Sequence, residues 1–375
     1  KTSSPKKSPS KKGEGFWSDL KKGIEEQLDT NDILDYLNHF GDIGVMDALI
    51  LSEDDVAYVS KRDKEGRLYF YYDVTVMLAT AETIEDTIKV AHDWQQKYET
   101  DHVRIRTVKF FSDGSNEADD TLSLEPFGAD PEGVRGKHCN FELEPMIKAL
   151  VRLNEERLDL HVHCVCDGTL RRMLDAIEGA QKICGDDWCI KVTIAHLEIM
   201  HPDDAKRFKK LGVCADISAH WLGSIPSITE ASLGEERSKR FLDFTQFIKD
   251  DICYGFSSDN MSPLGINQSS LFIGIEIAMT RIHPIFLDKT KYPNGRPPES
   301  SKFTLEQCIH AITYNNAKRM RILDKVGSIE VGKRACLTIL NKDIFTIPTE
   351  EIHTIEPDCI YFDGKELKIP NPLIK

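Results

Sequence analysis

Short apolar runs rich in β-branched residues alternate with longer amphipathic stretches along most of the chain. The apolar runs predict strands, and the stretches between them carry apolar residues at helical spacing. This alternation is typical of βαβ units and a parallel sheet. Strands are expected at about 43–50, 68–78, 103–111, 159–165, 190–197, 213–219 and 252–257. The sequence therefore predicts an α/β fold with seven parallel strands.

Helices are expected between these strands and after the last one. They are predicted at about 16–40, from Ser52 onward, and at 82–98, 141–156, 168–183, 202–211, 235–249, 266–283 and 304–321. A strand followed by a helix is the repeating unit of a TIM-type barrel, and about 250 residues build a complete one. A closed barrel of this type has eight strands. We therefore expect a (β/α)8 TIM-type barrel that lacks its first strand.

The pattern changes beyond residue 325, where short apolar segments are separated by turn residues. Antiparallel strands are expected at 327–333, 335–340 and 360–365, with a tight turn at Asp363-Gly364. The chain is accordingly divided into a disordered basic tail over 1–15, a barrel over 16–325 and a C-terminal β-sandwich module over 326–375.

Four polar side chains lie at or just beyond the ends of predicted strands. Lys109 stands in the run TVKFFSDG, His163 in HVH, His196 in IAH and Asp259 in SSD. In a parallel barrel the carboxyl ends of the strands converge on one mouth, where such enzymes keep their chemistry. Lysine, imidazole and carboxylate together at this mouth favour a hydrolytic metal site.

Composition narrows the class of protein. The net charge of −14 argues against nucleic acid as a partner. No apolar run approaches the roughly 18 residues of a membrane helix, and no secretory signal opens the chain, so a cytoplasmic protein is expected. The lysines of residues 1–12, interleaved with Ser and Pro, predict disorder, with nuclear localisation as an alternative.

The ten cysteines are expected to be reduced thiols. No CxxC pair exists, and half of the cysteines fall within apolar, strand-like runs, where buried thiols are common. These are Cys164, Cys166, Cys214, Cys253 and Cys336.

Several segments, taken in order, resemble the YtcJ-like members of the amidohydrolase superfamily (amidohydrolase family 3), which include N-substituted formamide deformylases. The similarity runs from about Ile33 to Lys365. It rests on Val108–Phe111 with Asp113-Gly114, His163 followed by Asp167, Ile194–His196, Gly255–Asp259 with Pro263-Leu264, Ala311–Ala317 and Gly327–Leu340.

The resemblance implies a metal-dependent hydrolase that cleaves carbon–nitrogen bonds other than peptide bonds, in amide-like or formamide-like small molecules. It implies one or two divalent ions, Zn²⁺ being expected, with His163 and His196 as ligands and Lys109 as a ligand that can be carbamylated. Asp259 matches the carboxylate that orients the metal-activated water and shuttles its proton. It also implies a composite β-sandwich built from both chain ends, and a homodimer is a candidate assembly.

Other residues near the predicted mouth have competing interpretations. His161 shares a strand face with His163 and is either a supporting or a buried histidine. Asp167 either caps the following helix or belongs to the site. His220 and Trp221, after the predicted strand 213–219, are candidates to line the substrate pocket, with His220 as the candidate substrate-binding residue and core packing as the alternative. The acidic loop 112–138 is expected to overhang the mouth, where such loops set specificity.

Departures from the family pattern leave two functional interpretations open. Family members carry a His-x-His pair on strand one, whereas this sequence has the basic tail before its first helix. Cys166 replaces a usual glycine, and Cys336 replaces a usual aspartate. We therefore weigh an active hydrolase whose reading frame continues upstream of Lys1 against an inactive fragment or pseudoenzyme that binds a partner. A sheet of these seven strands alone leaves exposed edges on the strands at 43–51 and 252–257, so aggregation of the isolated chain is expected.

Overall fold

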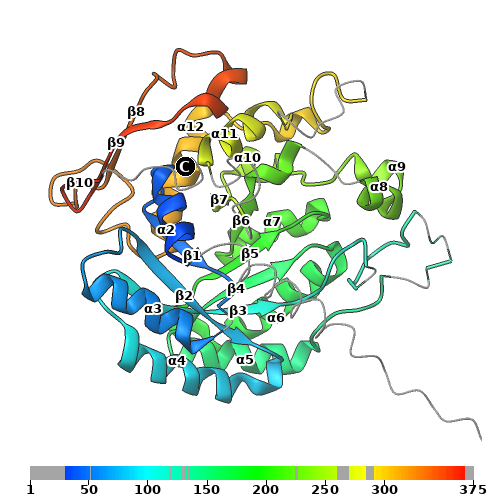
Figure 1. Cartoon of the computed structure of the whole chain (residues 1–375). Coiled ribbons are helices and arrows are strands. Elements are labelled where there is room, and N and C mark those ends of the chain that lie inside the picture. The colour runs from blue at the N-terminus through cyan, green and yellow to red at the C-terminus, as the bar shows by residue number, and fades with distance from the viewer. Residues whose placement is uncertain are drawn as a thin grey trace, which may run out of the picture.

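The computed structural model describes residues 30–50, 52–118, 120–128, 130, 132–133, 136–223, 227–259, 270–283 and 291–367. In this part of the chain a curled parallel sheet is surrounded by helices, and a small antiparallel sheet lies beside it (Figure 1). The predicted tail 1–15 and Pro263-Leu264 lie outside the described residues.

The seven predicted strands are all present and form one parallel sheet in sequence order. Each strand pairs with the next one along the chain, as consecutive βαβ units require. The strands are β1 (Gly44–Asp47), β2 (Tyr71–Leu78), β3 (Val103–Phe111), β4 (Asp159–Cys164), β5 (Val192–His196), β6 (Cys214–Ser218) and β7 (Tyr254–Ser257). The sheet curls as in a TIM-type barrel, and no described strand joins β1 to β7. The predicted fold class is thus confirmed.

Helices cover the outer face of this sheet, and apolar side chains fill the layer between. The helices are α2 (Thr30–His39), α3 (Glu53–Lys64), α4 (Ile84–Tyr98), α5 (Leu143–Glu155), α6 (Asp167–Cys184), α7 (Pro202–Leu211), α8 (Ser227–Leu233), α9 (Glu235–Ser238), α10 (Thr245–Asp250), α11 (Leu271–Thr280), α12 (Leu305–His310) and α13 (Asn316–Arg319). One continuous apolar core joins the sheet to these helices.

Two predicted helices are interrupted in the structure. The expected helix 235–249 is split into α9 and α10, and Leu242 between them has a positive φ of 53°, which ends a right-handed helix. The expected helix 304–321 contains a π-helical turn at Ala311–Asn315 between α12 and α13. The helical spacing of apolar residues does not reveal either break.

The C-terminal module is a three-stranded antiparallel sheet. Its strands are β8 (Leu337–Leu340), β9 (Pro357–Phe362) and β10 (Lys365–Leu367). Asp363 and Gly364 form the β9–β10 turn with φ angles of 49° and 79°, so the predicted tight turn is confirmed. The strand expected at 327–333 is wrong. Gly327 and Gly332 have φ angles of 95° and 96°, which no strand accommodates.

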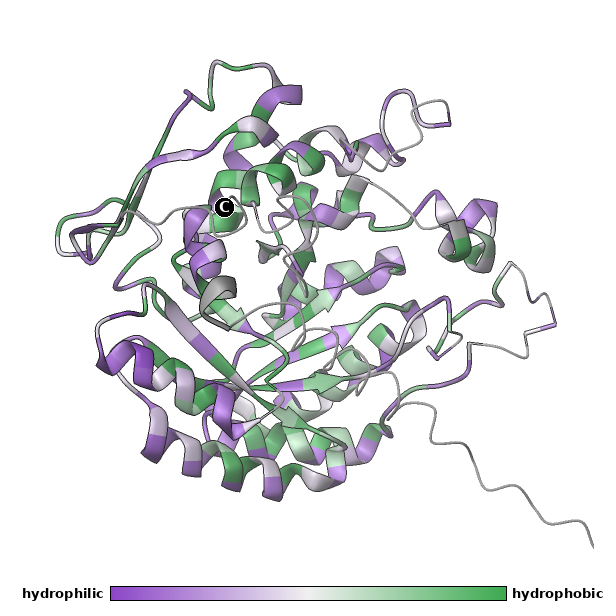
Figure 2. Ribbon diagram, viewed as in Figure 1, coloured by the Kyte–Doolittle hydropathy of each residue, from purple (hydrophilic) through white to green (hydrophobic). Residues whose placement is uncertain are grey.

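The module packs one face against the barrel and leaves the other face in solvent. Tyr71 of β2, Met320 and Phe362 of β9 share a small buried cluster between the two parts. Several apolar side chains remain exposed on the module, two in the turn segment before β8 and two in β8 itself, and Figure 2 colours the hydrophobic positions of the ribbon green. These side chains are Ile329, Val331, Leu337 and Ile339, which we call the outer apolar face.

One pair of cysteines is oxidised, contrary to the expectation of reduced thiols. Cys214 and Cys253 form a disulfide with a Cα–Cα distance of 4.7 Å. The next residues along, Ala215 and Tyr254, are partners in the β6–β7 register, which brings the two cysteines to the same level of neighbouring strands. The other eight cysteines are free thiols. Among the described residues no helix is long and apolar enough to cross a membrane.

Candidate functional site

Lys109 lies in β3 with its ammonium-bearing end buried, and it contacts His161 of β4. The strand register makes the two residues direct neighbours. Lys109 Nζ is 3.0 Å from His161 Nδ1, and the lysine is only 3% exposed. Burial lowers the pKa of Lys109 to about 8, against the opposing effect of Asp216 and Asp259. An appreciable fraction of the Lys109 amine is therefore uncharged near pH 7.

Behind Lys109 a buried chain of polar groups crosses the inside of the barrel. His161 Nε2 lies 2.9 Å from Asp216 Oδ2 of β6, and Arg319 of α13 forms an ion pair with the same carboxylate oxygen. Burial and the charge of Lys109 lower the pKa of His161 to about 4, so this imidazole is neutral. Burial alone would raise the pKa of Asp216, but Arg319 and His161 hold it well below the usual range of a carboxyl.

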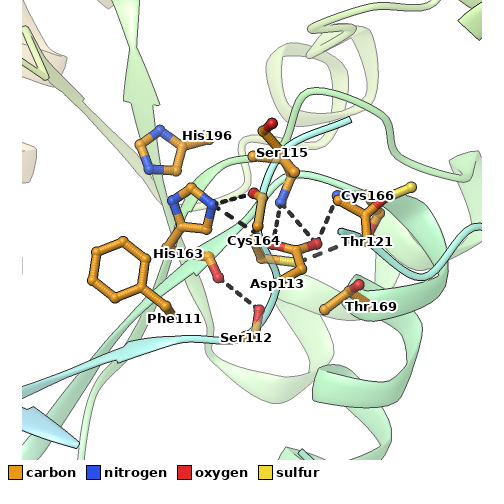
Figure 3. A network of polar contacts seen from close by, with 12 residues as sticks. Phe111, Ser112, Asp113, Ser115, Thr121, His163, Cys164, Cys166, Thr169 and His196 are labelled. Carbon is orange, nitrogen blue, oxygen red and sulfur yellow. Dashed lines mark hydrogen bonds and ion pairs between the residues drawn. The ribbon is translucent and has the colours of Figure 1, made fainter. Parts of the chain in front are cut away.

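His163 follows His161 in β4 and reaches the carboxyl end of the sheet. Its Nε2 donates to the carbonyl oxygen of Gly114 at 2.8 Å and lies 3.7 Å from Asp113 Oδ1 (Figure 3). Burial lowers its pKa to about 3, so the ring is neutral. Because the proton is on Nε2, Nδ1 carries the lone pair that a metal ion needs.

His196 ends β5 in a left-handed backbone conformation with φ 74°. Its ring centroid is 4.6 Å from that of His163, and Figure 3 shows the two imidazoles side by side. On its other side His196 stacks on Trp221, which follows β6 in a short 3-10 helix (Ala219–Gly223). Its Nδ1 lies 3.3 Å from Ser218 Oγ. Burial lowers the pKa of His196 well below 6.5, so this ring too is neutral.

Asp259 lies just beyond β7 with a positive φ of 48°. Asp259 is exposed to solvent. Desolvation by nearby protein atoms raises its pKa, while Lys109 acts to lower it. The charge of Asp259 acts to raise the pKa of Lys109, and the charge of Lys109 acts to lower the pKa of Asp259. A carboxyl with a raised pKa is suited to accept and return a proton.

Asp113 holds the loops that carry the site together. Its carboxylate accepts hydrogen bonds from the backbone N–H groups of Val165 and Cys166, and burial raises its pKa to about 7. It thereby ties the loop after β3 to the loop after β4. Cys166, where the family usually has glycine, has an ordinary extended conformation with φ −113°. A side chain at this position is therefore free of backbone strain.

His220 and Asp167 take structural positions. His220 is buried, its Nε2 donates to the carbonyl oxygen of Ser270 at 3.0 Å, and its ring packs on Gly274 of α11. Its neighbour Trp221 stacks on His196 instead. Asp167 is the first residue of α6, and its carboxylate binds the N–H of Leu124 and the guanidinium of Arg237. The substrate-binding role of His220 stays a prediction.

The chemistry of these donors fits a divalent metal ion. His163 and His196 are neutral, adjacent imidazoles, which are good ligands for Zn²⁺. The charge of Lys109 acts to lower the pKa values of both histidines, and Lys109 and Asp259 influence each other's pKa. Among the described residues, however, no three His, Cys, Asp or Glu side chains are clustered as a preformed metal site. The arrangement therefore offers a pair of imidazoles rather than a complete ligand set.

Sequence reasoning did not identify Asp216 or Arg319 as members of this site. An aspartate within the apolar run Val213–Ser218 is an unusual strand residue, and this signal could have pointed to Asp216. No sequence signal marks Arg319, because it reaches the barrel interior from a distant helix. The loop 112–138 contacts the loop after β5 through Asn116, which donates to Glu198 at 2.7 Å, and its expected place over the mouth stays a prediction.

A sequence model described as the amidohydrolase family matches residues 44–367. A search of curated proteins finds the exoenzymes regulatory protein AepA of Pectobacterium carotovorum subsp. carotovorum, which is 24% identical over 159 residues. That alignment covers 41% of this chain and 31% of the relative.

Solved structures share the fold. An uncharacterised metal-dependent hydrolase from Pyrococcus furiosus aligns with a TM-score of 0.64 and 22% identity, over 84% of this chain and 61% of that chain. A putative prolidase from Bifidobacterium longum aligns with a TM-score of 0.59 and 13% identity, over 91% and 76%. A guanine deaminase from C. acetobutylicum aligns with a TM-score of 0.54 and 12% identity, over 94% and 76%. The chain spans about three fifths of the Pyrococcus protein and about a third of AepA.

Proposed function

Because the chain belongs to the amidohydrolase family, we propose that it is a metal-dependent hydrolase that cleaves carbon–nitrogen bonds in small amide-like or formamide-like molecules. The observation that carries this proposal is the pairing of His163 with His196, whose neutral rings lie with centroids 4.6 Å apart at the carboxyl end of the sheet. Lys109 and Asp259 supply the amine and the carboxylate of the same mouth.

The proposed ligands are His163 and His196, with Lys109 as a further ligand if it is carbamylated. When bound, a Zn²⁺ ion would polarise the scissile carbonyl and lower the pKa of a water molecule towards about 7. His163 would bind through Nδ1, since Gly114 accepts the proton on Nε2.

Asp259 would act as the general base and general acid. Its pKa of about 7 lies near the working pH, so the group is present both as a carboxylate that can accept a proton and as an acid that can return it. The leaving amine of an amide or formamide needs such a proton. Trp221, stacked on His196, would exclude water from one side of this histidine and restrict its rotation.

Hydrolysis of a panel of N-formyl and N-acyl amines, measured with Zn²⁺, Mn²⁺ or Co²⁺ added, tests the proposal. We expect amine release by the wild type and a loss of at least about a hundredfold in kcat for Asp259→Asn, as general acid–base catalysis contributes about 10²–10⁴-fold. Asp251→Asn, at an exposed helix end, is the matched control. Equal rates for Asp259→Asn and the wild type would contradict the assigned role.

A second candidate function is a non-catalytic binding protein. The lack of a three-ligand cluster among the described residues favours it. The two candidates differ in one measurable respect, because only the hydrolase releases an amine in a metal-dependent way. A wild-type protein that binds an amide without hydrolysing it, at any of the three metals, would support the binding role.

A further inference from the structure

We propose that His161 is a positioning residue for Lys109, and that Asp216 and Arg319 fix its orientation and tautomer. This inference deepens the proposed function and rests on it, since Lys109 matters only if the mouth is a reactive site. His161 is not one of the residues on which the family resemblance rests. It is assigned here from its contacts alone.

The geometry is a continuous buried chain of four side chains. Lys109 Nζ is 3.0 Å from His161 Nδ1, His161 Nε2 is 2.9 Å from Asp216 Oδ2, and Arg319 pairs with that carboxylate. All four residues are less than 9% exposed. The residues come from β3, β4, β6 and α13, so the chain joins the sheet to the C-terminal helix across the barrel interior.

The tautomer of His161 follows from the partners of its two nitrogens. An ionised carboxylate only accepts hydrogen bonds, so Nε2 must carry the proton that Asp216 receives. In a neutral ring Nδ1 is then an acceptor, and Lys109 must donate to it. A protonated ring would add a third positive charge between Lys109 and Arg319, with Asp216 as the one carboxylate in contact.

This contact fixes the direction of a long and otherwise flexible side chain. Ordering a lysine side chain costs up to about 2 kcal/mol of rotamer entropy. A hydrogen-bond partner that holds Nζ in one position must offset this cost. With one hydrogen directed to His161, the remaining positions on Nζ are directed elsewhere, as a ligand or a carbamate would require. Asp216 and Arg319 hold the histidine in turn, as a third group orients the base in hydrolase triads.

Two substitutions at His161 separate its two hydrogen bonds. The side-chain oxygen of asparagine is as many bonds from Cα as Nδ1 of histidine is. His161→Asn therefore keeps an acceptor for Lys109 and loses the hydrogen bond to Asp216. The longer side chain of glutamine extends as far from Cα as Nε2 of histidine does. His161→Gln therefore keeps the hydrogen bond to Asp216 and loses the acceptor for Lys109. His310→Gln, on the exposed face of α12, is the control.

The first measurement uses the metal-free protein. Acetylation of Lys109 by acetic anhydride is followed by mass spectrometry relative to the exposed Lys148. We expect several-fold faster labelling of Lys109 in His161→Gln, because its amine is released, and a rate near that of the wild type in His161→Asn and His310→Gln. Equal labelling in His161→Gln and His161→Asn overturns the inference.

The second measurement is hydrolysis by the metal-loaded protein. A misplaced catalytic group costs about a hundredfold in rate, so we expect His161→Gln to lose about that factor in kcat with KM within twofold of the wild type. If the wild type does not hydrolyse amides, the proposed function fails while the labelling result still decides the role of His161.

Asp216→Asn provides an isosteric variant if His161→Gln does not fold. Its amide can donate to His161 Nε2, which moves the ring proton to Nδ1 and turns that nitrogen into a donor facing Lys109. We expect the same acceleration of Lys109 labelling. Labelling at the wild-type rate in Asp216→Asn contradicts a role for the carboxylate in setting the tautomer.

Discussion

The imidazole of His196 stacks on the indole of Trp221, with ring centroids 5.0 Å apart and planes inclined by 14°. The indole covers one face of the histidine, while His163 approaches its ring from another side. Because His196 also has a positive φ of 74°, its ring direction depends on these packing partners as well as on the strand.

Replacing Trp221 should therefore weaken metal binding without removing a ligand. We expect Trp221→Ala to lower Zn²⁺ affinity by about tenfold, since groups that orient metal ligands contribute about 10–100-fold. Trp221→Phe keeps an aromatic face and should retain most of the affinity. Competition with a zinc chelator measures both variants, and unchanged affinity in Trp221→Ala would show that the stack does not orient His196.

Lys109 should be needed for hydrolysis, and bicarbonate should support it. Burial lowers the pKa of Lys109 to about 8, which increases the neutral amine that carbon dioxide requires for carbamylation. We expect activity to fall in carbonate-free buffer, to return with bicarbonate and to be absent in Lys109→Ala. Lys148→Ala is the control. Wild-type rates of hydrolysis in Lys109→Ala would make this lysine structural only.

His102 should make the junction between the barrel and the C-terminal module pH-dependent. It lies between Asp63 of α3 and Asp363 of the β9–β10 turn, at 2.8 and 3.0 Å, and Arg334 contacts the same turn. Burial acts to lower the pKa of His102, but hydrogen bonds to the two carboxylates raise it above 6.5. The stabilisation is fully present below pH 6.5 and is lost as the pH rises through the raised folded-state pKa.

We therefore expect His102→Asn to lower the free energy of unfolding by about 1.5–3 kcal/mol at pH 6, the range for hydrogen bonds to charged groups. The difference from the wild type should shrink above the folded-state pKa. Urea unfolding at a series of pH values measures it, with His310→Asn as control. A difference that is constant with pH would exclude the protonated state as its source.

The outer apolar face of the C-terminal sheet should promote self-association. Ile329 and Val331 are about fully exposed, at 90% and 109%, and Ile339 of β8 is 49% exposed. Exposed apolar side chains favour association where they lie together on a surface. We expect Val331→Thr with Ile339→Thr to reduce the sedimenting fraction, whereas Ile183→Thr, at an isolated exposed position, should not. An equal sedimenting fraction in the double variant and in Ile183→Thr would show that self-association uses another surface.

Much of the barrel was predictable because its strands are buried on both faces and therefore appear as continuous apolar runs. The polar residues ending these runs, such as His163 and His196, were predictable for the same reason, since parallel strands bring their carboxyl ends together. The break at Leu242 and the turn at Gly327 were missed, because single residues with positive φ do not disturb apolar periodicity.

The supporting partners of the site were less predictable. Asp216 and Arg319 are far apart in the sequence and meet only because α13 packs under the sheet. The stacking of Trp221 rather than His220 on His196 depends on the local 3-10 helix after β6, which sequence spacing does not specify. Cys336, which stands where the family usually has aspartate, still forms hydrogen bonds at this position, because its sulfur contacts Asp363.

Zinc content of the purified protein tests the central claim most directly. We expect elemental analysis of wild-type protein, equilibrated with a slight excess of Zn²⁺ and desalted, to find weak binding at one site. His196→Ala should abolish this binding, because the remaining histidine alone is a poor site. His310→Ala, on the exposed face of α12, should keep the wild-type zinc content. Equal zinc in the wild type and in His196→Ala would contradict the assignment of the site.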